Sequence, residues 1–371
     1  MKIVGLGLRT LELPLLRPLR ISFGVVDQRP TLIVEIHTAD GLVGYGESSL
    51  LNVPISEPET LPVGRQLLID RLVPALSGRE FATVDDFSVF LLELLPDNPV
   101  TRIGVEGAFY HAQALSQGRY VGEYFGQHAN TFTVFASLGI ESDYAVLVRE
   151  ARRLVGLGYT ALKMKIEPGY AEAAVAAVRK ALPGIELAVD ANASFGAEDI
   201  DQVAQLDRYH LLFIEQPFAG QDLASHVRLQ RMVRTRVCLD ESILSLEDMQ
   251  AAIVAQAGRV VNIKPARIGS YVESQKIALA AQAAGWDVFG GGRLESGIGK
   301  AMNVALARMS AYTLPLDLSS SSEYFAGDVT EPRYEVAQGV AVVPEQIGLG
   351  LTPVPALLEQ YTSDYKLLEV A

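Results

Sequence analysis

The sequence predicts an α/β protein in which a closed (β/α) barrel follows an α+β domain. Three observations point to this class: short apolar strands recur through the second half of the chain, a helix-like stretch follows each strand, and one charged residue ends each strand. Short buried strands that alternate with amphipathic helices are typical of a parallel sheet. Because the pattern continues over several units, we expect the sheet to close into a barrel.

Five charged residues end these strands at a nearly constant interval. Lys165, Asp190, Glu215 and Asp240 stand 25 residues apart, and Lys264 follows after 24. Any one of them alone is best interpreted as a solvated charge where a strand meets a loop. The carboxyl ends of barrel strands converge on one mouth, however. Three carboxylates between two lysines, in strand order, therefore predict a functional site.

Local patterns predict the elements of the N-terminal domain. Strands are expected at residues 1–13, 31–38 and 42–47, with the turn dipeptide Asp40-Gly41 before the last of them. Between about residues 61 and 118, apolar residues recur at helical spacing. The domain is therefore expected to combine three strands with a few helices.

The barrel elements follow a polar link. We assign residues 1–125 to the α+β domain and 126–333 to the barrel, and we expect 334–371 to return to the first domain. The first barrel strand is expected at 133–137, and the last at 317–319.

Composition narrows the class of protein. The 371 residues carry a net charge of −13, which argues against nucleic acid and anionic membrane surfaces as partners. The N-terminus lacks a signal-peptide core, and no apolar run approaches the roughly 20 residues of a membrane-spanning helix. The single cysteine, Cys238, lies in an apolar run and is predicted to be a small core residue. We expect a soluble cytoplasmic protein.

Asp190, Glu215 and Asp240 predict a metal site. They end consecutive strands, and three anions that close together repel strongly unless a cation lies between them. Oxygen ligands without cysteine or histidine select a hard cation, so we expect Mg²⁺, with Mn²⁺ as the alternative. Three protein ligands would leave about half of an octahedral shell open for a substrate carboxylate and water.

Lys165 and Lys264 are predicted to face each other across the pocket, because their strands flank the metal strands. A lysine acts as a general base only if its pKa falls well below about 10.4. Burial, the neighbouring Lys163 and the dication would each lower it, and Lys163 is therefore counted with Lys165 and Lys264 among the catalytic residues. A C–H beside a carboxylate could then be deprotonated if the metal held the resulting enediolate. Two lysines could invert the carbon centre, whereas one could drive an elimination.

Other residues near the strand ends are candidates for orienting ligands or contacting substrate. Asn192 and Glu241 closely follow two of the acids, although turn and cap chemistry is a comparable interpretation for Asn192. The positive charge of Arg267 would alter the acid–base behaviour of Lys264, or else Arg267 would begin a surface helix. The glycines at 290–292 permit close backbone approach to a ligand. They lack the Gly-x-Gly-x-x-Gly fingerprint, so we reject dinucleotide binding.

The chain resembles the enolase superfamily, and within it the muconate-lactonising subgroup. The matching motifs are Lys163-x-Lys165, Asp190-Ala-Asn192, Glu215-Gln-Pro217, Asp240-Glu-Ser242 and Lys264-Pro, together with Gly44-Tyr-Gly-Glu47 in the first domain. The resemblance covers nearly the whole chain. It implies a modified (β/α)7β TIM-type barrel with an α+β capping domain, Mg²⁺ on the three acids, and Lys165 and Lys264 as the acid/base pair.

Two further stretches are similar to the branch that contains o-succinylbenzoate synthases and N-succinylamino acid racemases. They are Arg20-x-Ser22-Phe-Gly24 and Gly291-Gly292-x-Leu-Glu295-Ser296-Gly-Ile-Gly299, with Arg267 after the second lysine. The resemblance implies that Ser22, Gly291, Gly292, Glu295 and Ser296 lie near the substrate. Arg293 stands where the family usually has Met, and we expect it to alter the substrate.

The reaction implied by this resemblance is the syn dehydration of a cyclohexadiene carboxylate in menaquinone synthesis. Lys165 would act as base and then as acid, and Lys264 would stabilise the enediolate. One alternative is racemisation of acylated amino acids, or another cycloisomerisation or epimerisation of the muconate-lactonising type, on the same site. A remote alternative is a metal-stabilised binding protein without activity. The expected partners are a small-molecule carboxylate and further copies of the chain in a homo-oligomer.

Overall fold

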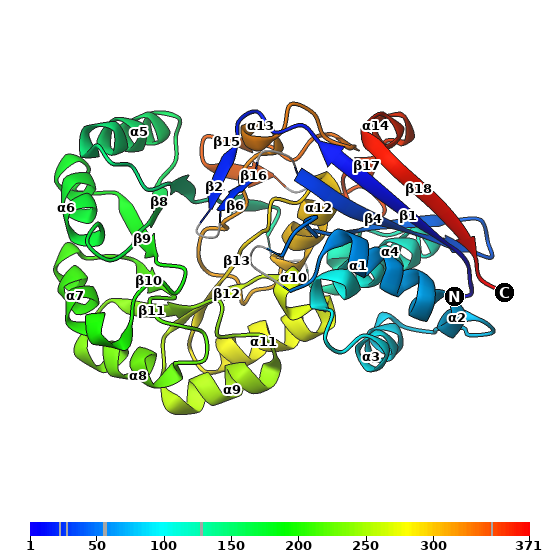
Figure 1. Cartoon of the computed structure of the whole chain (residues 1–371), viewed down its shortest axis with the longest axis horizontal. Helices are drawn as coiled ribbons and strands as arrows, with labels where there is room; N and C mark the ends of the chain where they lie inside the picture. The colour runs from blue at the N-terminus through cyan, green and yellow to red at the C-terminus, as the bar shows by residue number, and fades with distance from the viewer. Residues whose placement is uncertain (22–23, 27–28, 55–57, 127–128, 343) are drawn as a thin grey trace.

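The computed structural model describes residues 1–21, 24–26, 29–54, 58–126, 129–342 and 344–371. A sheet-and-helix domain lies beside an α/β barrel, and the chain crosses from the first to the second and returns at its end (Figure 1). None of the helices in these ranges is long and apolar enough to span a membrane.

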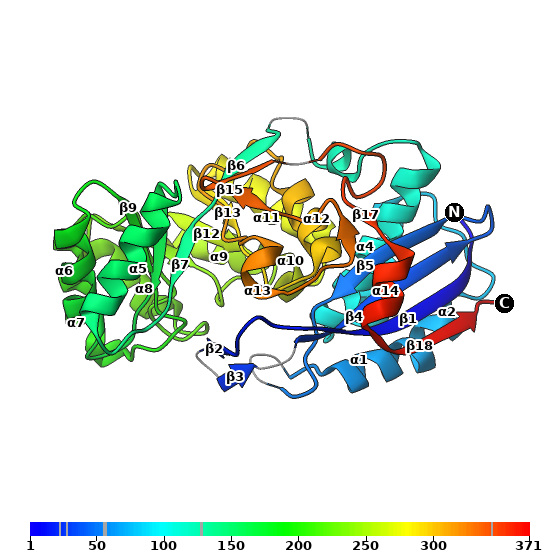
Figure 2. The same cartoon turned by 90° about the horizontal axis from the view of Figure 1, so that it is seen from above.

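The first domain is built on a four-stranded antiparallel sheet. The strands are β18 (Thr362–Glu369), β1 (Ile3–Leu13), β4 (Arg29–Thr38) and β5 (Val43–Ser48), in that order. The three N-terminal strands that the sequence predicts are thereby confirmed. The fourth comes from the end of the chain, and so both termini lie close together (Figure 2).

Helices of the first domain pack against this sheet or against one another. They are α1 (Leu61–Leu67), η1 (Leu68–Leu72), α2 (Val73–Leu76), α3 (Val84–Leu94), α4 (Pro99–Ser116) and η2 (Val121–Tyr124). Helices α4 and α1 pack against the sheet, whereas α3 and η2 pack on α4. Helix α4 lies directly on β5, where Gly44 and Gly46 make room for it. A Cβ at Gly46 would stand 2.0 Å from the carbonyl oxygen of Gly104, so no other residue fits at this crossing.

The barrel sheet has seven parallel strands. In order they are β7 (Ala136–Leu138), β8 (Ala161–Lys165), β9 (Glu186–Asp190), β10 (Phe213–Glu215), β11 (Arg236–Leu239), β12 (Val260–Ile263) and β13 (Asp287–Gly290). Residues 316–317 close the ring, because Leu316 bridges Val134 on one side and Asp317 bridges Gly291 on the other. The predicted barrel is confirmed, although two bridging residues replace the full strand expected at 317–319.

Helices surround the barrel. They are α5 (Tyr144–Gly156), α6 (Ala171–Ala181), η3 (Ala197–Asp199), α7 (Ile200–Ala204), η4 (Gln205–Tyr209), α8 (Leu223–Met232), α9 (Leu246–Ala255), α10 (Pro265–Ile268), α11 (Tyr271–Ala283), α12 (Gly297–Leu306) and α13 (Ser321–Tyr324). Five of them begin at a side chain that accepts a backbone N–H: Asp143, Asp222, Ser245, Ser270 and Ser296. Such caps satisfy amides that the first turn of a helix leaves without a partner.

The remaining short elements join the two parts of the chain. They are β2 (Leu19–Ile21), β3 (Gly24–Val26), β6 (Thr131–Thr133), β14 (Thr330–Glu331), β15 (Val336–Ala337), β16 (Val340–Val342), β17 (Thr352–Pro353) and α14 (Pro355–Tyr361). Strand β16 pairs with β6, next to the barrel, whereas β18 joins the first domain's sheet. The domain bounds of 1–125, 126–333 and 334–371 stay a prediction.

The barrel interior is packed by a layer of apolar side chains. The layer consists of Phe135, Ala161, Ala188, Phe213, Cys238, Val260 and Phe289, all fully buried. The rings of Phe213 and Phe289 stack with their centroids 5.1 Å apart, and Phe135 meets both edge-on. Large rings and small side chains together fill the interior. Cys238 is a core residue, as the sequence predicts.

Two buried glutamates of the first domain hold barrel helices at their N-termini. The Glu47 carboxylate accepts hydrogen bonds from the amides of Ser296 and Gly299 at the start of α12. The Glu106 carboxylate accepts from the amides of Tyr271 and Val272 at the start of α11, at 2.7 and 3.2 Å. Helix N-termini favour negative charge, so both contacts dock the first domain onto the barrel.

Glu106 should make the stability of the protein depend on pH. Burial raises the pKa of its carboxyl from 4.5 to about 6, although its hydrogen bonds oppose the rise. The folded chain thus keeps a proton that the unfolded chain releases, and this contribution is full below about pH 4.5 and lost as the pH rises through about 6. Between pH 4.5 and 7, the free energy of unfolding should fall by roughly 2 kcal/mol more in the wild type than in Glu106→Gln.

Denaturant unfolding of both proteins at several pH values measures this difference. The contribution of Glu106 would be refuted if the two free energies of unfolding changed in parallel across that pH range.

Candidate active site

Side chains along a strand alternate between its two faces, and this alternation places the charged residues in layers above the apolar layer. Two residues beyond Ala161, Ala188 and Phe213 stand Lys163, Asp190 and Glu215. Because alternate residues of a strand point to the same face, these side chains enter the barrel interior just above the packed layer. Lys165, two residues further along β8, lies nearer the mouth, with 39% of its side chain exposed against 3% for Lys163.

The three predicted metal ligands lie at neighbouring strand ends and are buried. Glu215 pairs with Asp190 in the sheet register, and Asp240 follows directly after β11. Asp190, Glu215 and Asp240 are each at most 1% exposed. The Gln216 side chain accepts the Asp240 amide at 2.8 Å and so ties the end of β10 to the end of β11.

Lys163 stands among the carboxylates. Its ammonium nitrogen lies 3.2 Å from Asp190 Oδ2 and 3.0 Å from Glu215 Oε2. It also lies 2.5 Å from Asp317 Oδ2, on the segment that closes the ring. Burial lowers the pKa of Lys163, but Asp317 and Glu215 outweigh that effect and raise it well above its ordinary value. These contacts favour the charged form of Lys163, and its predicted catalytic role stays a prediction.

Lys165 and Lys264 approach the same cluster from its two sides. The Lys165 ammonium donates to Asp190 Oδ2 at 2.8 Å and also to Asn192 Oδ1. The Lys264 ammonium donates to Asp240 Oδ2 at 2.7 Å. Burial lowers the pKa of Lys264, yet the facing Asp240 carboxylate produces a net rise. Each lysine thus contacts a different acid of the cluster.

The buried acids shift one another's pKa values. Burial raises the pKa of Glu215 to about 7, and the charge of Asp190 adds to the rise. Burial would also raise the pKa of Asp190, but Lys165 and Lys163 lower it well below its usual range. The pKa of Asp240 is also lowered, because Arg267 and Lys264 outweigh the effect of its burial. These opposite shifts result from buried acids that lie within electrostatic reach of one another.

Asn192, Glu241 and Arg267 connect the two sides of the cluster. The Asn192 side-chain amide donates to Glu241 Oε1 at 3.2 Å. One Arg267 nitrogen lies 3.6 Å from the same oxygen, and another donates to Asp240. Asn192 also has a positive φ of 44°, as the turn after β9 requires. The structure therefore brings together these three residues, which the sequence placed beside the ligands.

The polar groups of the loop after β13 bond mainly to other groups of the protein. Glu295 accepts the Arg293 amide at 2.7 Å and an Asn303 N–H at 3.2 Å. The Ser296 hydroxyl donates to Glu47 at 2.6 Å. Gly292 donates its amide to the Asp317 carbonyl. A substrate role for Gly292, Arg293, Glu295 and Ser296 stays a prediction, as does one for Ser22, which lies outside the described residues.

The surrounding side chains explain why residue 291 is a glycine. A Cβ at this position would lie 2.8 Å from Lys264 Cε and 2.7 Å from Asn262 Oδ1. Glycine therefore makes room for the Lys264 side chain at the mouth. Arg29 fixes the same loop from the first domain, because its buried guanidinium donates to the carbonyls of Arg293 and Leu294.

Sequence reasoning missed two residues of the cluster, Asn262 and Asp317. The Asn262 amide donates to Glu215 Oε1 at 2.7 Å. It stands two residues before Lys264, so the same strand period that relates Lys163 to Lys165 would have found it. Asp317 begins the predicted last strand, which would place it at the amino end of that strand and away from the mouth, so the sequence pattern gave no signal for it.

The cluster fits a hard divalent cation in the chemistry of its donors. No three His, Cys, Asp or Glu side chains within the described ranges are grouped to hold a metal ion as they stand; ammonium and guanidinium groups contact the carboxylate oxygens instead. One of these cations, the Lys163 ammonium, lies between Asp190 and Glu215. Asp240 is near enough to raise the pKa of Glu215. Buried carboxylates that already attract cations are suitable ligands for Mg²⁺.

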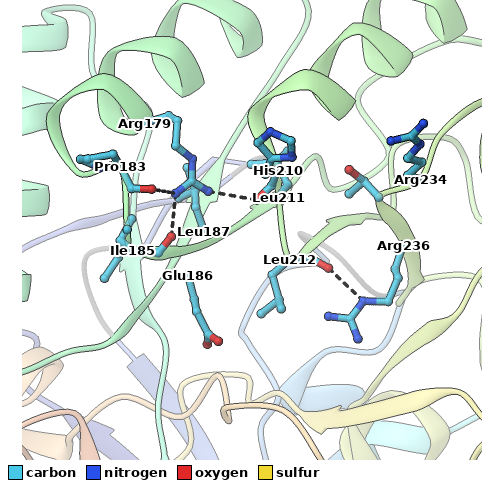
Figure 3. Close-up of a pocket in the computed structure, with 12 residues that line it drawn as sticks. Arg179, Pro183, Ile185, Glu186, Leu187, His210, Leu211, Leu212, Arg234 and Arg236 are labelled. Carbon is cyan, nitrogen blue, oxygen red and sulfur yellow. Dashed lines mark hydrogen bonds between the residues drawn. The ribbon is translucent and has the colours of Figure 1, made fainter.

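A cavity of about 400 Å³ lies at the opposite end of the barrel, beside the starts of β9, β10 and β11 (Figure 3). Two of the arginines that line it, Arg179 and Arg236, donate to backbone carbonyls. Arg179 donates to the carbonyls of Pro183, Ile185, Tyr209 and His210, and Arg236 donates to that of Leu212. The cavity contains none of the clustered acids or lysines, and we assign Arg179 and Arg236 to holding the loops at the barrel base.

Comparison with known proteins covers nearly the whole chain. Residues 146–357 match the family model described as enolase C-terminal domain-like, and residues 7–126 match that of the mandelate racemase / muconate lactonizing enzyme N-terminal domain. The chain is 36% identical to the N-succinylamino acid racemase of Thermus thermophilus over 95% of both chains. It is 34% identical to the o-succinylbenzoate synthase of Listeria innocua over 95% of this chain and 94% of that one. A solved structure of an enolase-superfamily member from Listeria innocua matches with a TM-score of 0.94 and 32% identity, over 100% of each chain.

Proposed function

Because the chain belongs to the mandelate racemase / muconate lactonizing enzyme family of the enolase superfamily, we propose that it is a Mg²⁺-dependent o-succinylbenzoate synthase. The observation that carries the proposal is the placement of two lysines on two sides of one acidic cluster, Lys165 on Asp190 and Lys264 on Asp240. The full-length similarity to o-succinylbenzoate synthases supports the choice of reaction.

In this proposal, Asp190, Glu215 and Asp240 hold the metal, with Mn²⁺ able to replace Mg²⁺. A bound dication would stabilise the negative charge that builds on the substrate carboxylate when the α-proton leaves. These acids, through the metal that they hold, would also orient the carboxylate of a small-molecule substrate in the mouth. A cytoplasmic location, a role in menaquinone synthesis and a homo-oligomeric state belong to the same proposal and rest on the family resemblance.

The two lysines take different roles in the dehydration. Lys165, the more exposed of the two, would remove the proton from the α-carbon and return it to the departing hydroxyl, so that water leaves from one face. Lys264 would remain an ammonium ion, paired with Asp240 at 2.7 Å. Its charge would then stabilise the developing anion without a proton transfer.

Racemisation of an N-acylated amino acid is the second candidate. It is favoured by the symmetry of the contacts, because an amine stands on each side of the cluster and each bonds one acid. Two amines on opposite faces could remove the α-proton from one face and deliver it to the other. The similarity to two N-succinylamino acid racemases points the same way.

One pair of assays separates these functions. With Mg²⁺ present, we expect turnover of the cyclohexadiene carboxylate precursor, followed by its ultraviolet absorbance; absence of turnover would remove the synthase assignment. N-succinylamino acids are then incubated in D₂O, and deuterium at the α-carbon is measured by NMR or mass spectrometry. Exchange without dehydration would select the racemase, and exchange together with dehydration would show both activities.

A further inference from the structure

Asp317 adds a further carboxylate to the cluster, from the segment that closes the barrel. Its Oδ2 lies 2.5 Å from the Lys163 ammonium nitrogen, and its Oδ1 accepts the Ser137 hydroxyl at 3.2 Å. The residue is held in the ring by its bridge to Gly291. Asp317 therefore faces the ligands from across the barrel, and the Lys163 ammonium bridges it to Asp190 and Glu215.

Lys163 is shared among three carboxylates. An ammonium group has three N–H donors, and here they meet Asp317 at 2.5 Å, Glu215 at 3.0 Å and Asp190 at 3.2 Å. Only 3% of the lysine side chain is exposed, so water cannot replace a lost partner. A buried charge without a partner is strongly destabilising. The ammonium must therefore stay close to one or more of these acids.

We propose that Asp317 is a positioning residue for metal binding, which draws the Lys163 ammonium toward the closing segment and leaves Asp190 and Glu215 available to the cation. The inference rests on the proposed function, because it takes these two acids as metal ligands. A dication that approaches them repels the ammonium. Asp317 gives the displaced ammonium a buried partner, and without Asp317 the ammonium would remain on the ligands and compete with the metal.

The test is a double-mutant cycle read by metal affinity. Mn²⁺ and Mg²⁺ are titrated by calorimetry, and bound Mn²⁺ is counted by electron paramagnetic resonance, so that no turnover is needed. Asp317→Asn should raise the metal dissociation constant about tenfold or more, as expected for charged groups in direct contact. In a Lys163→Met background, which has no ammonium to position, the same substitution should change it less than about threefold.

Asp287→Asn is the matched control. It removes the same charge from the other end of the barrel, where Asp287 pairs with Arg236 and accepts from Thr313. Metal affinity should be unchanged in this variant. Circular dichroism and thermal unfolding establish that each variant is folded.

Several results would overturn the inference. Asp317→Asn with wild-type affinity would do so, and so would an equal loss in both backgrounds, because Asp317 would then act only through its charge. If Asp317→Asn fails to fold, the metal affinity of Lys163→Met decides. The inference requires Lys163→Met to bind metal at least as tightly as the wild type. A wild type that binds no divalent cation would instead refute the metal site of the proposed function.

Discussion

Replacing Lys165 by alanine is expected to lower dehydration turnover roughly a hundred- to ten-thousandfold, the usual contribution of a positioned acid–base group. Lys165 reaches the cluster by its bonds to Asp190 and Asn192 and is the more exposed of the two amines. Removing it leaves only Lys163 on that side, deeper in the barrel and almost fully buried. Steady-state kinetics with the cyclohexadiene substrate measure the loss, which should fall on kcat more than on KM.

Arginine substitutions separate a base from a fixed cation. An arginine side chain keeps its proton at every working pH. Lys165→Arg should therefore be as inactive as Lys165→Ala, whereas Lys264→Arg should keep at least about tenfold more dehydration activity than Lys264→Ala, because charge stabilisation survives. In racemisation of N-succinylamino acids, where Lys264 must accept and donate a proton, the two Lys264 variants should be equally poor.

The control for these lysine variants is Lys180→Ala. Lys180 is exposed on α6, in the same strand–helix unit as Lys165, and its loss should leave both activities unchanged. The assignment of Lys165 as base would be wrong if Lys165→Arg retained the dehydration activity of the wild type.

Glu215→Gln is expected to abolish metal binding in the micromolar range and dehydration with it. Glu215 is fully buried, and its two oxygens accept from Asn262 at 2.7 Å and Lys163 at 3.0 Å. A neutral amide keeps the shape but removes the charge that attracts the dication.

Asn262→Ala, which only releases one oxygen of Glu215, should weaken metal binding about 10- to 100-fold, as for other residues that orient a ligand. Calorimetric titration of Mn²⁺ ranks the variants.

Metal binding should also depend on pH. Burial and Asp190 raise the pKa of the Glu215 carboxyl from 4.5 to about 7. Protons then compete with the cation for this ligand, so the apparent affinity should fall as the pH drops below about 7 and level off above it. An affinity that stays constant from pH 5 to pH 8 would contradict this role of Glu215.

Chelation should remove activity without unfolding the protein. Lys163, Lys165, Lys264 and Arg267 already pair the buried acids, so the metal-free chain has no uncompensated cluster of negative charge. Added Mg²⁺ should restore turnover and raise the free energy of unfolding by about 2.7 kcal/mol at a hundredfold excess over the dissociation constant. Irreversible loss of circular dichroism after chelation would contradict the expectation.

Much of the barrel follows from local sequence patterns. The interval of about 25 residues between Lys165, Asp190, Glu215 and Asp240 matches the length of one strand–loop–helix unit, and the structure has one acid or lysine near each of those strand ends. Strand 133–137 was predicted less well. It divides into β6, which pairs with β16, and β7, which belongs to the barrel. A short apolar run does not reveal that its two halves have different partners.

The contacts of the candidate site were harder to predict for the same reason. Glu47 belongs to a motif that carries the family resemblance, yet its partner Ser296 is 249 residues away. Asp317 lies in a segment too short and irregular to form a full strand, and it bonds Lys163 from the other side of the ring. No spacing along the chain indicates either pair.

By itself, therefore, the sequence determined the repeated unit, the end of the barrel at which the acids and lysines stand, and their order around it. These features depend on backbone geometry within one unit, where alternate strand residues share a face. Only the tertiary structure decided that Lys163 is shared with Asp317, that Asn262 holds Glu215, and that Glu47 caps α12. Those choices depend on how the ring closes and on the cost of burying a charge without a partner, and both are properties of the whole fold.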